Sequence, residues 1–145
     1  MESRAISDAE ISASSEWDPN HAAIQGRLNF QAGRGKQGGW SAKQNDQNQW
    51  LQADLGSNKN ITHLATQGRN GHDQWVTSYK VEYSDNGASF YCYQEHGTDK
   101  IFTANSDRDT IVYNVVSPPI TARYIRIVPR AFFDHISMRM EIYGC

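Results

Sequence analysis

The chain has 145 residues, with 14 basic and 16 acidic side chains, a formal net charge of −2 and a pI of about 6.2. Without a basic excess, the composition does not favour nucleic acid or a strongly anionic surface, and either partner would need a local patch. No apolar run approaches the roughly 20 residues that a membrane-spanning helix requires. The length fits a single domain over residues 1–145 that buries a substantial core.

The first part of the chain alternates short strand-like segments with polar loops. Residues 16–26 contain Asp18-Pro19-Asn20, which favours a tight turn, and residues 31–49 are polar and glycine-rich. Residues 76–84 place Tyr79, Val81 and Tyr83 on one face, so that face is predicted to be buried. The strands predicted in this part cover residues 6–15, 26–30, 50–55, 61–66 and 76–84.

The second part continues the same pattern. Asp85-Asn86-Gly87 predicts a hairpin turn, and Pro118-Pro119 is predicted to end the strand before it. The last segment alternates apolar residues with Ser137, Arg139 and Glu141, which predicts one buried and one solvated face. The strands predicted in this part cover residues 90–93, 110–116, 123–128 and 136–143. With no long helix predicted, the fold class is all-β, an antiparallel sandwich or barrel closed by short turns.

No residue pattern specifies catalysis. Gly33, Gly35 and Gly38 satisfy G-x-G-x-x-G, but neither the buried strand nor the following helix of a dinucleotide site is predicted. The chain has no nucleophile elbow, and its five histidines lack metal-ligand spacing. We therefore predict no enzyme activity, metal or cofactor. Calcium is not predicted either, because acids such as Asp18, Asp107 and Asp109 lack EF-hand-like spacing.

Five motifs carry a resemblance to a known family. In chain order they are WLQADLG (50–56), ATQGR (65–69), WVTSYKVEYSDNG (75–87), PPITARYIRI (118–127) and HISMRMEIYGC (135–145). Together they resemble the discoidin domain, also called the coagulation factor V/VIII type C domain, from about Ile6 to Cys145. The resemblance implies a jelly-roll-like, galactose-binding-domain-like β-sandwich that acts as a non-catalytic recognition module through loops at one end.

The ligand loops implied by the resemblance are residues 17–25, 37–49 and 69–75. They contain an aromatic plate for a sugar ring and polar groups that read its hydroxyls. Trp50 and Trp75 are assigned to the core, whereas Trp40 is left open between packing and ligand contact. The candidate ligand residues are Trp17, Asp18, Asn20, His21, Trp40, Asp46, Arg69, His72 and Asp73.

The resemblance leaves three ligand classes open. Galactose-type glycans on a cell surface or matrix are favoured, as for a lectin or adhesion module. Phosphatidylserine membranes need bulky apolar loop tips, yet residues 22–24 are Ala-Ala-Ile and the second tip reads KQNDQN. Arg34, Lys36 and Lys43 provide a modest basic rim. A protein ligand such as collagen or a receptor is the third class. Weak single sites imply multivalent assembly or a larger parent protein.

Domains of this family are usually extracellular. The chain shows no basic-then-apolar signal segment, so we expect a leader outside this sequence or export by another route. Asn60-Ile61-Thr62 is then a glycosylation acceptor. In many members a cysteine upstream of Met1 pairs with the terminal cysteine, and that partner is missing here. Cys92 is predicted to be a small buried thiol, and no bridge to Cys145 is expected, because spacing alone does not establish close approach.

Three arginines alternate with apolar residues on predicted strands. We expect Arg123, Arg126 and Arg139 to pair with the acids Asp54, Glu82 or Glu141 rather than to contact a ligand.

Overall fold

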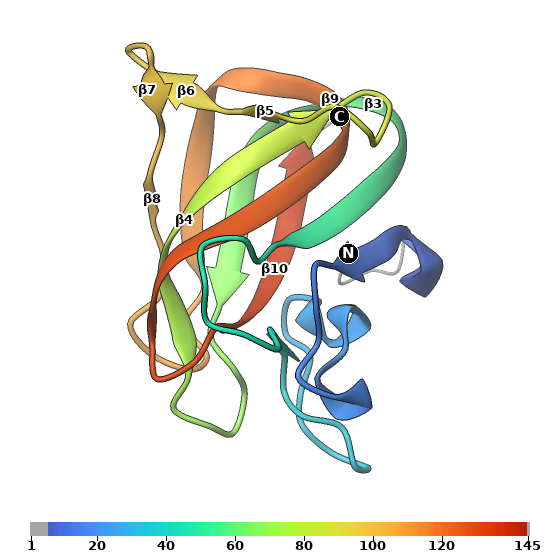
Figure 1. Ribbon diagram of the computed structural model, residues 1–145, viewed down its shortest axis with the longest axis vertical. Coiled ribbons are helices and arrows are strands. Elements are labelled where there is room, and N and C mark those ends of the chain that lie inside the picture. The colour runs from blue at the N-terminus through green and yellow to red at the C-terminus, as the bar shows by residue number, and fades with distance from the viewer. Residues whose placement is uncertain (1–5, 145) are drawn as a thin grey trace.

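The computed structural model describes residues 6–144. Strands are the main regular structure of the described chain, joined by long loops and by three short 3₁₀ helices near its start (Figure 1). In chain order the elements are η1 (Asp8–Glu10), β1 (Ile11–Ala13), η2 (Pro19–His21), η3 (Ala23–Gly26), β2 (Trp40–Ser41), β3 (Leu51–Gln67), β4 (Trp75–Ser84), β5 (Tyr91–Cys92), β6 (Gln94–Glu95), β7 (Thr98–Asp99), β8 (Phe102–Thr103), β9 (Val112–Phe133) and β10 (Ser137–Gly144).

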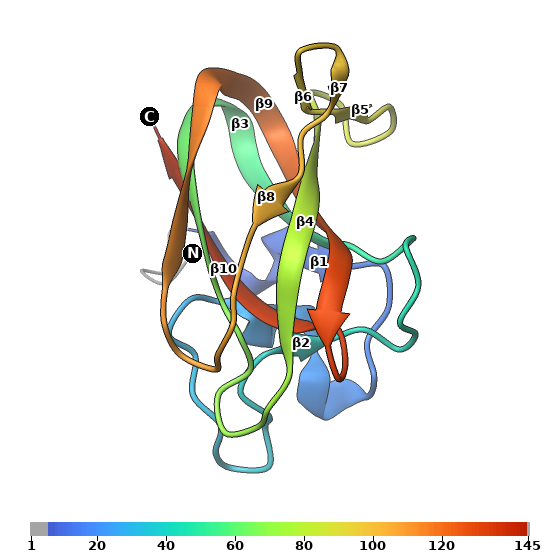
Figure 2. The same cartoon turned by 90° about the vertical axis from the view of Figure 1, so that its left-hand side faces the viewer.

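The strands form an antiparallel sandwich, which confirms the predicted fold class. Pairing follows the order β2-β10-β3-β9-β4-β5, with β1 on β3, β8 on β4 and a separate β6-β7 hairpin. Strands β3 and β9 are long enough to serve both layers. Residues 61–66 of β3 pair with β10 and with the first half of β9, whereas residues 51–54 pair with β1 and with the second half of β9. Figures 1 and 2 show these two strands curving from one layer into the other.

Two predicted strand breaks do not occur. Residues 50–55 and 61–66 belong to the single strand β3, and Pro118-Pro119 lies inside β9 instead of ending a strand. Both places coincide with shifts in register, between Asp54 and Lys59 and between Ile61 and His63. Prolines lack a backbone N–H, and they are tolerated where the ladder is already interrupted. The chain bends at these points while remaining extended.

The two N-terminal strand predictions were largely wrong. A capping interaction, in which the Ser7 backbone N–H donates to Glu10 Oε1 at 2.8 Å, starts a 3₁₀ helix, so only residues 11–13 pair with β3. Residues 26–30 contain a single bridge between Arg27 and Met140. The left-handed backbone of Asn29 (φ 65°) prevents a regular strand there.

The core lies between the layers. It contains Tyr79 and Val81, as predicted, and Trp40, Leu51 and Met138, each with an exposed fraction of 0%. The predicted solvated face of the last strand is instead buried at Ser137, Arg139 and Glu141. This face is buried because the segment that ends at Phe30 packs over it. The Leu28 N–H donates to Met140 O, and Arg139 Nη1 donates to Phe30 O at 2.8 Å.

Two of the three predicted arginine pairs are confirmed. Arg123 donates to Asp54 at 2.8 Å, and Arg126 lies 3.9 Å from Glu82. The third was wrong, because Arg139 pairs with Asp109 at 2.7 Å instead of with Glu141.

The Cys92 thiol is half-buried. Burial, with a smaller contribution from Asp99, raises its pKa to about 11. It is therefore a protonated, poorly nucleophilic thiol at neutral pH. Cys145 lies outside the described residues, as does any bridge to it. Within residues 6–144, no helix has the length and apolar character needed to cross a bilayer.

Candidate functional site

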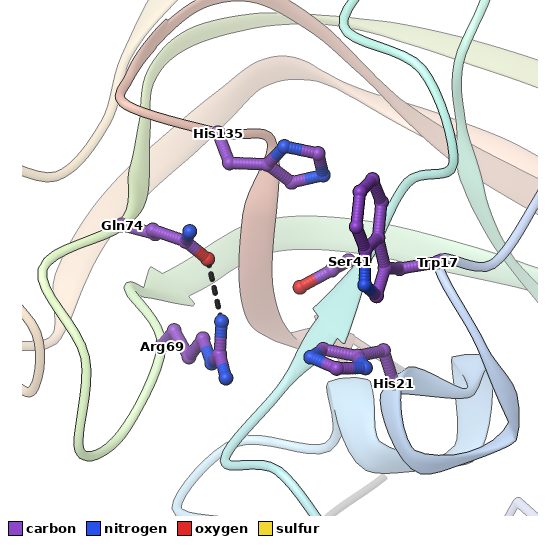
Figure 3. Close-up of a pocket in the computed structure, with 6 residues that line it drawn as sticks. All are labelled: Trp17, His21, Ser41, Arg69, Gln74 and His135. Atoms are coloured by element: carbon purple, nitrogen blue, oxygen red, sulfur yellow. Dashed lines mark hydrogen bonds between the residues drawn. The ribbon is translucent and has the colours of Figure 1, made fainter.

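A cavity of about 350 Å³ opens among the loops at one end of the sandwich (Figure 3). Its wall combines residues from four segments that are distant in the sequence. Sheet pairing places β2 beside β10, and this pairing brings the loops around these strands together. The lining residues are Trp17, His21, Ser41, Arg69, Gln74 and His135.

The Asp18-Pro19-Asn20 turn fixes one wall. Asp18 caps η2 by accepting the Asn20 backbone N–H at 2.8 Å, and Pro19 begins the helix. The same carboxylate lies 2.6 Å from His21 Nδ1, and this hydrogen bond lowers the pKa of Asp18 below its ordinary value. Since Nδ1 donates to Asp18, Nε2 is the ring nitrogen of His21 left for a ligand.

The second wall is aromatic. Trp17 is 55% exposed, and its backbone N–H donates to Ser41 O at 2.8 Å. Its ring meets the His135 ring edge-on, with centroids 5.3 Å apart. Both nitrogens of His135 are occupied, since Nε2 donates to Ala42 O at 2.7 Å and Nδ1 accepts from Asn45. His135 therefore offers ring surface to the cavity, and Trp17 supplies a broad, accessible aromatic plate.

Arg69 closes the opposite side of the cavity. Its terminal nitrogens donate to two neutral amides, Gln74 at 2.7 Å and Gln37 at 2.6 Å. Burial lowers its pKa, and the nearby charge of Asp18 acts in the opposite direction, but a guanidinium stays protonated at any physiological pH. Because each terminal nitrogen carries two hydrogens, each has one left after these bonds within the described chain.

A hydrogen-bonded chain sets the polarity of the cavity floor. Ser137 Oγ donates to Gln74 Oε1 at 3.0 Å, so the 2.6 Å contact between Ser41 and Ser137 leaves Ser41 Oγ with lone pairs to accept. Gln74 Nε2 in turn donates to Asp134 at 3.1 Å. The cavity thus offers acceptors on Ser41 and His21 and donors on Arg69.

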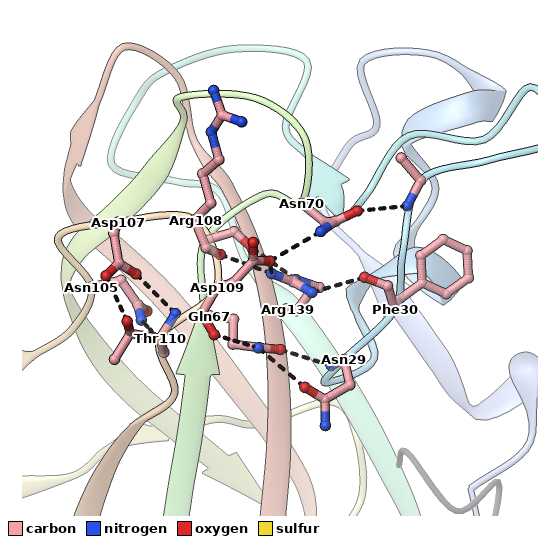
Figure 4. Close-up of polar contacts among 12 residues, drawn as sticks. Asn29, Phe30, Gln67, Asn70, Asn105, Asp107, Arg108, Asp109, Thr110 and Arg139 are labelled. Atoms are coloured by element: carbon pink, nitrogen blue, oxygen red, sulfur yellow. Dashed lines mark hydrogen bonds and ion pairs between the residues drawn. The ribbon is translucent and has the colours of Figure 1, made fainter.

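Arg139 braces the loops behind this wall (Figure 4). Its side chain is 1% exposed and donates to the backbone carbonyls of Gly68, Phe30 and Arg108, each at 2.8 Å, and to the Asp109 carboxylate at 2.7 Å. Three separate loops are thereby held against β10. The loop that carries Arg69 is one of them.

The structure brings together three of the predicted ligand residues, Trp17, His21 and Arg69, with Asp18 directly behind His21. Trp40 has an exposed fraction of 0%, and its indole N–H donates to Ser15 O, so its role is packing. We therefore leave Trp40 out of the candidate site.

The remaining predicted residues lie outside the cavity lining. Asn20 accepts the Gln37 N–H through its carbonyl, and Asp46 caps its own loop through the Asn48 N–H and Gln49. His72 is exposed, and Asp73 points to a different cavity with Arg108. Trp75, which was assigned to the core, is partly exposed and also lines that second cavity.

Sequence reasoning missed Ser41, Gln74 and His135. Gln74 lies inside a loop that was already predicted to bind, and His135 lies in the short loop that follows two exposed aromatics, Phe132 and Phe133, at the end of β9. An aromatic and polar loop of this kind was the available signal. Ser41 had no such signal, because only the pairing of β2 with β10 brings it to the site.

Comparisons with known proteins agree with this architecture. The family model for the F5/8 type C domain matches residues 10–142. Lactadherin of Rattus norvegicus is 37% identical over 150 residues, which cover 100% of this chain and 35% of lactadherin. The structure of discoidin II from Dictyostelium discoideum superposes with a TM-score of 0.85 at 35% identity, covering 92% of this chain and 54% of that chain.

A more distant structure shares the fold. The CBM32 module of AlyQ, solved in complex with 4,5-unsaturated mannuronic acid, has a TM-score of 0.68 at 20% identity, covering 97% of this chain and 96% of that module. This chain spans about a third of the length of the rat and mouse lactadherins that it matches. The motifs, the sandwich and the family match agree, and the chain belongs to the F5/8 type C (discoidin) domain family of non-catalytic binding modules.

Proposed function

We propose that the domain binds a neutral, galactose-type glycan in the cavity between Trp17 and Arg69. The observation that carries the proposal is the combination of an aromatic plate with a divided set of donors and acceptors. A sugar hydroxyl both donates and accepts, so one hydroxyl can donate to Ser41 or His21 while accepting from Arg69. The cavity volume, about 350 Å³, is at the lower end of the range for small-molecule sites.

The charge balance supports a neutral ligand. Arg69 is the cation in the lining, and the Asp18 carboxylate behind His21 interacts favourably with it. The cavity therefore carries little net charge, and a ligand that enters it contacts mainly hydrogen-bond donors and acceptors. The galactose class itself comes from the resemblance to discoidin domains, and the cavity supports a hydroxyl-rich ligand.

Binding by one site is expected to be weak, because sugar hydroxyls exchange water contacts for protein contacts of similar strength. Useful avidity then requires several copies or a larger parent protein, with glycans of the cell surface or matrix as partners. Relatives such as lactadherin are longer than this chain. We propose the same modular use and an extracellular location here.

Membrane binding is a second candidate, favoured by one observation. The end of β9 exposes Phe133 (51%) and Phe132 (37%), and His135, which follows in the next loop, contacts the ring of the 55% exposed Trp17. The sequence alone had suggested that this end lacks bulky apolar groups. Exposed aromatics at one end suit insertion into the boundary between lipid headgroups and acyl chains.

The test is a glycan-array screen of the domain presented multivalently, run beside sedimentation with phosphatidylserine and phosphatidylcholine liposomes. The proposal expects selective binding to galactose-terminated glycans that is lost in Trp17→Ala. Tyr91→Ala, which removes a 65% exposed ring at the opposite end of the sandwich, is the matched control. A silent array with sedimentation that depends on phosphatidylserine would replace the glycan proposal with the membrane one.

A further inference from the structure

A second cavity, of about 370 Å³, lies on the other side of the loop between β3 and β4. The two cavities share that loop as a common wall. Gln74 lines the first cavity, whereas its neighbours Asp73 and Trp75 line the second. This is the alternation expected of an extended segment, in which successive side chains point to opposite sides. The complete lining is Asp73, Trp75, Asp107, Arg108, Asp109 and Thr110.

The second cavity has an aromatic wall of fixed orientation. Trp75 pairs with Phe133 across β4 and β9, and their rings stack with centroids 4.8 Å apart and planes 13° apart. Phe133 covers one face of the indole, so a ligand in the cavity would meet the ring on its other side or at its edge. An aromatic ring that is already held in place loses little entropy when it contacts a ligand.

The polar side of the cavity is also built in advance. Arg108 Nε donates to Asp73 Oδ1 at 2.7 Å, with side-chain exposures of 44% and 67%. Within residues 6–144, neither terminal nitrogen of Arg108 nor the second oxygen of Asp73 has a hydrogen-bond partner. Figure 4 shows the Arg108 side chain pointing away from Arg139 and the hydrogen-bonded cluster beneath it. Donors and an acceptor therefore stand side by side at the mouth of the cavity.

The backbone under these groups is tightly fixed. Asp107 accepts both the backbone N–H and the hydroxyl of Thr110, at 2.9 and 2.6 Å. Asp109 is held by Arg139 and Asn70. Gly68 packs so closely beneath the loop that a Cβ there would lie 2.4 Å from Asp107 O. The loop that carries Arg108 is thus a rigid platform.

Charge narrows the ligand class. The lining holds three carboxylates, of which Asp73 pairs with Arg108 and Asp109 with Arg139, so one negative charge remains and disfavours an acidic sugar or a phosphate. We propose that this cavity is a second carbohydrate site, which takes an uncharged or amino-bearing pyranose on Trp75 and reads its hydroxyls with Arg108 and Asp73. The ligand class rests on the proposed glycan-binding function, while the site itself is separate. Two sites on one domain would let a single copy engage branched glycans bivalently.

The four tryptophans make the two sites separately observable. In a ¹⁵N-labelled sample, each indole N–H gives its own NMR signal: Trp17 reports the first cavity and Trp75 the second, while the buried Trp40 and the Arg126-covered Trp50 serve as references. Galactose, glucose, mannose, glucosamine and glucuronate are titrated in turn, with glycerol as the non-specific polyol.

We expect a neutral or amino sugar to shift the Trp75 signal saturably, and glucuronate and glycerol not to do so. The Trp75 response persists in Trp17→Ala and weakens about tenfold in Arg108→Ala, as expected for loss of hydrogen bonds to a charged group. Arg130→Ala, which removes an exposed arginine outside both cavities, leaves it unchanged.

The outcomes separate the two proposals. Saturable shifts at Trp17 alone would overturn the second site and leave the first intact, whereas shifts at Trp75 alone would support the second site and contradict the first. A Trp75 shift that is lost in Trp17→Ala, or that Arg108→Ala does not weaken, would refute a separate site. No saturable shift at either ring would overturn both.

Discussion

The buried guanidinium of Arg139 gives the sharpest stability prediction. Arg139→Met keeps an unbranched apolar stem but shortens the side chain and removes all four hydrogen bonds. The Gly68 carbonyl is left buried without its partner, and the Phe30 and Arg108 carbonyls are left partly shielded from water. An unsatisfied buried polar group costs about 1–3 kcal/mol, and breaking a buried charged pair costs about 3–5 kcal/mol. Asp109 is 56% exposed and regains water, so we expect a total loss of about 3–4 kcal/mol.

The assay is urea unfolding monitored by fluorescence and circular dichroism, and linear extrapolation to water gives the free energy of unfolding. Arg123→Met is the control, because it removes a two-bond arginine–carboxylate pair whose guanidinium side chain is 40% exposed. Exposed ion pairs are weak because water screens them, so Arg123→Met should lose far less stability than Arg139→Met. Equal losses in the two variants, or a loss below about 1 kcal/mol for Arg139→Met, would refute the loop-bracing role.

Three further predictions concern other parts of the chain. The hydrogen bond from Arg123 lowers the pKa of Asp54, although burial opposes this shift. The stability that this pair contributes is therefore present above a pH of about 4 and is lost as the pH falls through the lowered pKa. Asp54→Asn should flatten the acid limb of a pH–stability curve. Gly68→Ala would place a Cβ 2.4 Å from Asp107 O and should destabilise the fold by about 1–3 kcal/mol in urea unfolding; an unchanged midpoint would contradict the tight packing. Asn60 should carry a glycan in material from a eukaryotic secretory host, detected by mass spectrometry and lost in Thr62→Ala; unmodified Asn60 would count against that route.

The sequence was sufficient for the fold class because the alternation in the central strands reports burial directly. Tyr79 and Val81 lie in the core as their period of two predicts. The same rule failed in the last strand. The face that carries Arg139 is covered by a segment more than a hundred residues earlier, and local alternation holds no information about such a cover.

The N-terminal region shows a second limit. A capping interaction at Ser7 and a left-handed Asn29 interrupt segments that read as extended. In the long strands the sequence predicted a break that does not occur. Pro118-Pro119 indicates the end of a strand, but the register shift in β9 accommodates both prolines.

The candidate site was half predictable. Trp17, His21 and Arg69 were found because they lie in polar loops with the chemistry of ligand recognition. Ser41 required the sheet order, because only the pairing of β2 with β10 brings it to the cavity. Trp40 could not be resolved from the sequence, because an indole at a loop edge packs or binds depending on a rotation that only the fold determines.

The measurement that tests the central claim most directly is a calorimetric titration of the domain with a galactose-terminated oligosaccharide, comparing Trp17→Ala with Tyr91→Ala. Both variants remove one exposed aromatic ring, at opposite ends of the sandwich. We predict measurable binding to the native domain, unchanged affinity in Tyr91→Ala, and loss of at least about tenfold in Trp17→Ala. Equal affinity in both variants, or no heat from any galactose-terminated ligand, would contradict the account.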